Sequence, residues 1–138
     1  MAAYNKFNAF VLDITKAVHN FSSDALWVML TNVAPVATNA VFADLTDISA
    51  GNGYSAGGAV ATLTSNTQTS GVQKLILQNV VFTASGAVGP FRYAVLYNHT
   101  AASKNLVAWW DYGSGVTLAS GDTFTVSFDG TNGVETIT

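Results

Sequence analysis

Charged residues are scarce in this 138-residue chain, and that scarcity narrows the choice of partners. Only 9% of the residues are charged, whereas a typical globular domain has about 25%. The five basic residues are scattered along the sequence, and a surface that binds duplex nucleic acid needs clustered Lys and Arg to displace the counterions of the phosphates. We therefore expect no nucleic-acid partner.

Cysteine is absent, which excludes disulfides, thiolate metal ligands and cysteine nucleophiles. Long hydrophobic runs are absent too. The longest clean apolar run extends only from Ala25 to Leu30, whereas a membrane-spanning helix needs about 20 apolar residues. Polar residues also interrupt the N-terminal segment, where a signal peptide would carry its hydrophobic region. We expect no membrane contact and a chain that stays in the compartment where it is made.

Metal-binding motifs are missing as well, and the sequence offers no complete catalytic motif. The two histidines, His19 and His99, belong to no pattern with metal-ligand spacing, and a catalytic zinc site needs three protein ligands. Serines are plentiful, and Gly53-Tyr54-Ser55-Ala56-Gly57 has the Gly-x-Ser-x-Gly spacing of a serine nucleophile. It lies in a glycine-rich loop, however, and not between a strand and a helix, which is the context that this motif requires. We therefore predict a protein that is not an enzyme, holds no metal or cofactor and has no small-molecule substrate.

A helical pattern is present near the N-terminus. From Phe7 to Phe21, apolar residues recur with the spacing of one helical face, and polar residues fall on the other side. The pattern predicts a helix within residues 1–22. Because this face carries Phe10 and Phe21, we expect it to pack on the rest of the domain or on a neighbouring subunit.

From Ala25 onward the chain is rich in Val, Thr, Phe and Tyr and is punctuated by Gly, Asn and Ser, a pattern typical of short strands joined by turns. We predict strands at residues 26–31, 58–65, 72–84, 91–98, 106–112, 123–129 and 134–138, with a short strand or helical turn near 41–48. The prediction is a single domain, 1–138, with a mainly β fold. The N-terminal helix (1–22) precedes a β-sandwich (25–138) of seven or eight antiparallel strands, jelly-roll-like first and immunoglobulin-like second.

Strand alternation assigns faces to several large side chains. Trp109 and Trp110 are expected on opposite faces, one in the core and the other at the surface or an interface. In 91–98, Phe91 is expected to share a face with Tyr93, Val95 and Tyr97. Pro90 cannot donate to a β-ladder, so it is expected to open that strand.

Arg92 is the only arginine, and its planar guanidinium suits a fixed contact with carbonyls or a carboxylate. The 49% apolar content exceeds what a small monomer needs to bury, and a neutral surface rich in Ser, Thr and Asn suits broad, permanent contacts. We therefore expect an oligomer or a subunit of a larger assembly. The candidate interface residues are Phe10, Phe21, Arg92, Trp109 and Trp110.

Four strings carry a resemblance: LTNVAPVA at 30–37, AGNGY at 50–54, GPFRYAVLYN at 89–98 and WWDYGS at 109–114. With them, nearly the whole chain resembles a family of small structural proteins of tailed bacteriophages. The resemblance implies a non-enzymatic virion protein, first of all a capsid decoration (cement) protein. Such a protein would be made in the host cytoplasm and bind the major capsid protein on the capsid surface, as a homotrimer.

Two alternatives to this function stay open at the level of sequence. The first is a tail or fibre component that contacts the host surface. The second, an enzyme acting on cell-wall sugar, rests only on the string Trp109-Trp110-Asp111, because aromatic faces stack on sugar rings and a carboxylate could serve hydrolysis.

Overall fold

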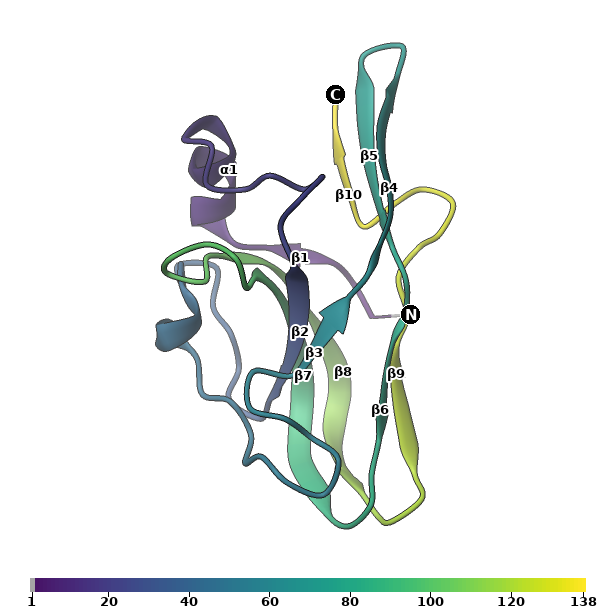
Figure 1. The fold of residues 1–138 in the computed structure, drawn as a ribbon. Coiled ribbons are helices and arrows are strands. Elements are labelled where there is room, and N and C mark those ends of the chain that lie inside the picture. The colour runs from purple at the N-terminus through teal and green to yellow at the C-terminus, as the bar shows by residue number, and fades with distance from the viewer. Residues whose placement is uncertain (1) are drawn as a thin grey trace.

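The computed structural model describes residues 2–138 and is built mainly of antiparallel strands (Figure 1). This confirms the predicted fold class, although the described residues form ten strands rather than seven or eight. No helix among these residues is long and apolar enough to cross a membrane. The elements are β1 (Asn5–Lys6), α1 (Asn8–Thr15), β2 (Leu26–Thr31), the 3-10 helix η1 (Phe42–Asp44), β3 (Ala59–Ala61), β4 (Leu63–Thr69), β5 (Val72–Leu77), β6 (Val80–Thr83), β7 (Val88–Asn98), β8 (Leu106–Leu118), β9 (Thr123–Val126) and β10 (Glu135–Ile137).

The strands form two layers. One layer is a five-stranded sheet with the order β1-β8-β7-β2-β3, and the other consists of a three-stranded sheet, β10-β5-β4, and a two-stranded sheet, β6-β9. Figure 1 shows these two smaller sheets one above the other, facing the five-stranded sheet. The chain passes between the layers from β3 to β4, from β6 to β7 and from β8 to β9, so three short connections join the two layers.

Two clusters of buried side chains pack on the two faces of the five-stranded sheet. The larger cluster fills the space between the layers and includes Leu30 and Leu96 from one side and Leu75 from the other. The smaller cluster includes Met29 and Tyr97 and covers the outer face of the five-stranded sheet. Strand β2 is therefore buried on both faces, which explains why its sequence is continuously apolar rather than alternating.

The N-terminal helix is shorter than predicted, because it ends at Thr15 instead of continuing toward residue 22. Ala17 has a left-handed φ of 59°. The N–H of Ala17 donates to the carbonyl of Ile14 (3.2 Å), and the N–H of Val18 donates to that of Asp13 (3.0 Å), which is the Schellman ending of a helix. The helical spacing of apolar residues continues to Phe21 because the chain after the helix turns back over the same core.

Two predicted strands are each divided in the structure. Residues 58–65 contain β3 and β4, and residues 72–84 contain β5 and β6. Each division falls where the chain leaves one sheet for another, at Thr62 and at Gln78–Asn79. Residue composition does not mark such a point, because both flanking strands remain rich in β-forming residues. The short strand β1 also lies within the region predicted as helical.

A bulge changes the face of the sheet to which the side chains of β7 point. Phe91 pairs with Val116 and Tyr93 with Asp111, so residues 112–115 of β8 lie opposite the single residue Arg92. Phe91 consequently belongs to the core between the layers, together with Ala94 and Leu96, while Val95 and Tyr97 belong to the outer cluster. The prediction that Phe91 shares a face with Tyr93, Val95 and Tyr97 is therefore wrong.

Pro90 lies inside β7 rather than at its start, because the strand begins at Val88. The pairing with β8 is irregular between Val88 and Phe91. A missing N–H is tolerated at such a point, because no regular ladder bond is required there.

Candidate functional site

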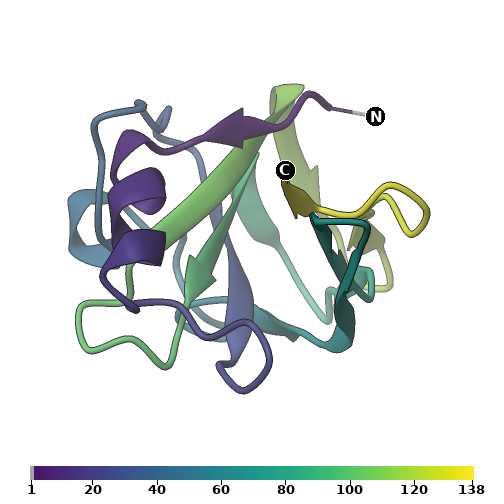
Figure 2. The same cartoon turned by 90° about the horizontal axis from the view of Figure 1, so that it is seen from above.

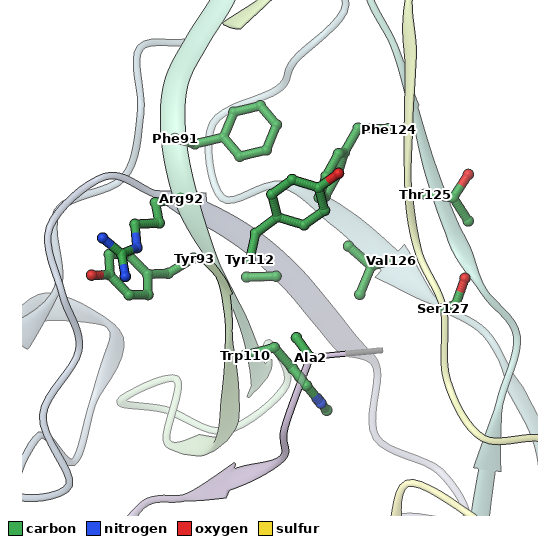
Figure 3. A pocket seen from close by; sticks show the side chains of 11 residues that line it. Ala2, Phe91, Arg92, Tyr93, Trp110, Tyr112, Phe124, Thr125, Val126 and Ser127 are labelled. Carbon is green, nitrogen blue, oxygen red and sulfur yellow. The ribbon is translucent and has the colours of Figure 1, made fainter. Parts of the chain in front are cut away.

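An apolar cleft of about 380 Å³ separates β7 and β8 from β9 (Figure 3). A short turn at residues 119–122 joins β8 to β9, as in a hairpin, yet the two strands belong to different sheets. Within residues 2–138, β8 has no second strand partner after Trp109, and β9 pairs only with β6. The cleft therefore runs between two strand edges whose backbone groups are free to accept another strand.

Aromatic side chains line this cleft. Phe91 and Phe124 meet edge to face with 4.8 Å between their ring centroids, and Tyr112 and Phe124 do so at 5.3 Å. Phe91 is fully buried, whereas the side chain of Tyr112 is 57% exposed. Figure 3 shows the rings of Tyr112 and Phe124 reaching toward each other between the strands. The cleft thus has a rigid aromatic floor and an exposed aromatic side chain at its mouth.

The chain's own N-terminal segment already uses one of these edges. Strand β1 pairs antiparallel with β8, with Asn5 opposite Trp109 and Lys6 opposite Ala108. Tyr4 packs edge to face on Trp110 with a centroid distance of 5.9 Å, and Ala2 lines the cleft. This arrangement is an example, within the molecule, of a short extended segment added to the edge of β8.

An ion pair neutralises the only charged side chain among the described residues that line the cleft. Arg92 donates from Nε to Asp111 Oδ1 (2.8 Å) and from Nη2 to Asp111 Oδ2 (2.9 Å). The hydrogen bond from Arg92 is the main cause that lowers the pKa of Asp111, with a second contribution from the N–H of Gly113. The prediction that Arg92 binds a carboxylate is confirmed. Figure 3 shows the guanidinium beside the ring of Tyr93, 5.4 Å from its centroid, and away from Phe91, Tyr112 and Phe124. The ion pair leaves the cleft without a free charge.

The other candidate interface residues lie in different places. Trp109 packs on Phe7 in the outer cluster at a centroid distance of 4.5 Å, and Trp110 packs on Phe128 in the inner core at 5.6 Å. The two tryptophans lie on opposite faces of β8, as predicted. Both are half-buried, so neither is a fully buried core residue or a fully exposed one. Each face of β8 is partly covered by another segment at this point.

Phe10 and Phe21 stack on each other within the chain's own core, at a centroid distance of 6.0 Å. Of the five candidates, Arg92 and Trp110 line the cleft. Sequence reasoning missed Tyr112 and Phe124 as members of one site. The available signal was the Gly113-Ser114-Gly115 string after Tyr112, which marks where β8 departs from regular pairing.

Acidic and histidine side chains have structural partners. Within the described part of the chain, no three His, Asp or Glu residues gather closely enough to hold a metal ion. Asp47 accepts hydrogen bonds from the hydroxyl of Tyr54 (2.5 Å) and the N–H of Gly57 (2.6 Å). His99 stacks on Trp27 with a centroid distance of 4.2 Å. These contacts order the loops around the sandwich.

Comparison with known proteins identifies no relative whose site residues could be mapped onto this chain. No family model matches the chain, and neither a curated protein nor a solved structure matches it.

Proposed function

We propose that the chain is a non-enzymatic virion structural protein of a tailed bacteriophage, a decoration protein that binds the major capsid protein and stabilises the head. The sequence strings at 30–37, 50–54, 89–98 and 109–114 support the virion role. The proposed mode of binding to the capsid rests on the aromatic cleft between the unpaired edges of β8 and β9.

The proposed contact is the addition of an extended capsid segment to the edge of β8. An added strand gains main-chain hydrogen bonds from the edge and specificity from pockets for alternate side chains. Here the pockets lie among Phe91, Trp110 and Tyr112. Strand β1 occupies the neighbouring stretch of the same edge in the same manner, so the added segment would continue an existing pairing rather than require a new one.

The segment that fits this cleft is uncharged. Arg92 is already paired with Asp111, and the remaining lining residues are apolar, aromatic or hydroxylated. Burying a charged side chain there would cost free energy with no opposite charge to compensate. Binding should therefore persist in about 0.5 M salt, where contacts between exposed charges are screened.

Assembly of the decoration protein as a homotrimer is part of the same proposal. Several large apolar side chains outside the cleft are exposed and available for subunit contacts. The residues concerned are Val11 and Leu12 on α1, Val33 and Val36 after β2, Val60 on β3 and Val81 on β6. A trimer held by these contacts would also resist salt, because apolar burial is not screened.

A reconstitution assay tests the proposal. Purified protein is added to heads from a phage that lacks its gene, and bound protein is measured after sedimentation. We expect saturable binding, and at least a tenfold loss of affinity for Tyr112→Ser. The matched control is Val72→Ser, which truncates an exposed side chain at the start of β5, outside the cleft.

The outcomes separate the two parts of the proposal. If the wild-type protein does not bind heads, the decoration role is wrong. If it binds and Tyr112→Ser binds equally well, the role holds but the cleft is not the contact site.

A further inference from the structure

A second cavity, of about 420 Å³, lies at the end of the sandwich beside α1. Seen from above in Figure 2, α1 and the turn after it face the ends of β4, β5 and β10 across this end of the molecule. Ile14, His19 and Phe21 line one wall, and Asn66 on β4, Gln73 on β5 and Ile137 on β10 line the other. The cavity shares no lining residue with the aromatic cleft.

The histidine on the first wall presents a hydrogen-bond donor. Asn98 Oδ1 accepts from the N–H groups of Thr100 (3.0 Å) and Ala101 (3.1 Å), so the orientation of its amide is fixed. Its Nδ2 therefore donates to His19 Nδ1 (3.1 Å) and to Asp24 Oδ2 (2.7 Å). Because Nδ1 accepts a hydrogen bond, the neutral ring carries its proton on Nε2.

His19 is held in this neutral form. Burial lowers its pKa from the usual value, although Asp13 and Asp24 act in the opposite direction. The ring packs against Phe10 and Phe21, at centroid distances of 5.3 and 5.5 Å. Its Nε2 is buried and has no hydrogen-bond partner among the residues that the structure describes.

The glutamine on the second wall presents the complementary acceptor. Gln73 Nε2 donates to Asn66 Oδ1 (2.7 Å), and Asn66 Nδ2 in turn donates to Ser22 Oγ (3.2 Å). In this arrangement the Gln73 amide directs its NH2 group to Asn66 and leaves its oxygen unused. Gln73 Oε1 is buried and, within residues 2–138, has no partner. A buried polar atom without a partner is rare in a folded protein and indicates a place where another molecule supplies the bond.

We propose that this cavity binds a neutral secondary amide. The ligand carbonyl would accept from His19 Nε2–H, and the ligand N–H would donate to Gln73 Oε1. In a trans amide these two groups point in opposite directions, which suits a donor and an acceptor on different walls. The carbon groups on either side of the amide would contact Ile14, Phe21 and Ile137.

The lining argues against charged ligands. None of the described residues that line the cavity is charged. A carboxylate could accept from His19 but would face the carbonyl oxygen of Gln73, and an ammonium group would face the N–H of His19. A secondary amide satisfies both groups, and it occurs in acetamido sugars and in peptide bonds. The proposal is independent of the virion role.

The test is a titration followed by NMR of the full chain with four probes. N-methylacetamide is the minimal amide, N-acetylglucosamine and N-acetylalanine methylamide represent the two sources, and glucose is the sugar without an amide. We expect the amide probes, but not glucose, to shift the ring signals of His19 and the side-chain amide of Gln73. The tighter binder of the two larger probes identifies the source.

A pair of matched variants provides the second measurement. Gln73→Met keeps the length of the side chain and removes the acceptor, and Gln68→Met makes the same change on β4, outside the cavity. We expect at least a tenfold weaker amide binding for Gln73→Met and no change for Gln68→Met. If no amide probe shifts these signals in the wild-type protein, if glucose shifts them equally, or if Gln73→Met binds as before, the proposal is wrong. The wild-type titration decides the matter even if Gln73→Met does not fold.

Discussion

Arg92 and Asp111 lie on the neighbouring strands β7 and β8, and their side chains form two parallel hydrogen bonds of 2.8 and 2.9 Å. Asp111 Oδ1 also accepts from the N–H of Gly113 (2.8 Å). The pair therefore fastens β7 to the beginning of the 112–115 bulge. Because Tyr112 is part of that bulge, the ion pair fixes the side chain at the mouth of the cleft.

Replacing Arg92 with Lys tests this role. Lysine is a point charge and does not reproduce two parallel hydrogen bonds to one carboxylate. Both side chains are 40% exposed, so we expect only a small drop in melting temperature. The affinity for heads should fall more clearly, because Tyr112 loses its support. Lys16→Arg is the control for a change of basic residue on the surface, and an unchanged affinity for Arg92→Lys would refute the role.

The buried face of α1 can be tested by truncation. Phe10 is 1% exposed and packs on Phe21, so Phe10→Ala should lower the free energy of unfolding by about 3–5 kcal/mol. Val11 is 51% exposed on the same helix, and Val11→Ala should change it by no more than about 0.5 kcal/mol. Urea unfolding of the two variants measures both values, and equal losses would show that the helix face is not buried.

The end of α1 offers a stabilising substitution. Ala17 has a left-handed backbone conformation, which costs a residue with a Cβ roughly 1–2 kcal/mol and costs glycine far less. We expect Ala17→Gly to raise the free energy of unfolding by about 1 kcal/mol, after the greater freedom of glycine in the unfolded chain is included. Ala9→Gly, in the first turn of the same helix, should lower it by up to about 1 kcal/mol. The opposite signs are the test, since a destabilised Ala17→Gly would contradict the Schellman ending.

Because His19 is neutral in the folded chain, we expect the stability of the protein to depend on pH. Its pKa is lower in the folded chain than in the unfolded chain because of burial. The unfolded state therefore binds the proton more readily, and the stabilisation is complete above the unfolded pKa of about 6.5 and is lost as pH falls through the folded value. We expect the melting temperature to drop between pH 7.5 and pH 5, and to drop less in His19→Gln. An equal drop in the two proteins would assign the effect to other groups.

The local pattern of apolar and polar residues was enough to predict a buried strand and the start of the helix. Residues 26–31 form a strand with the predicted bounds, because a continuous apolar run between turn residues has few other uses. The helix begins near the predicted place, although nothing in the sequence marks its end. Ala17 takes a conformation that glycine or asparagine would have signalled.

The cleft could not be predicted, because it depends on which strands fail to pair. Ser120-Gly121-Asp122 is a turn signal, and a turn between two strands normally indicates a hairpin. Here β8 and β9 enter different sheets after it. That outcome is set by the partners β7 and β6, which come from earlier in the chain. The face of the sheet that a side chain occupies was predicted correctly only where no bulge intervened. The bulge opposite Arg92 placed Phe91 in the inner core instead of on the outer face.

The most direct test of the decoration role is the quantity of this protein in separated parts of purified particles. Heads and tails are isolated, and the ratio of the chain to the major capsid protein is measured in the heads by quantitative mass spectrometry. The proposal predicts a fixed ratio, with a copy number comparable to that of the capsid protein, and no copies in isolated tails. A protein present in few copies and only in tails would contradict it and would favour the fibre alternative.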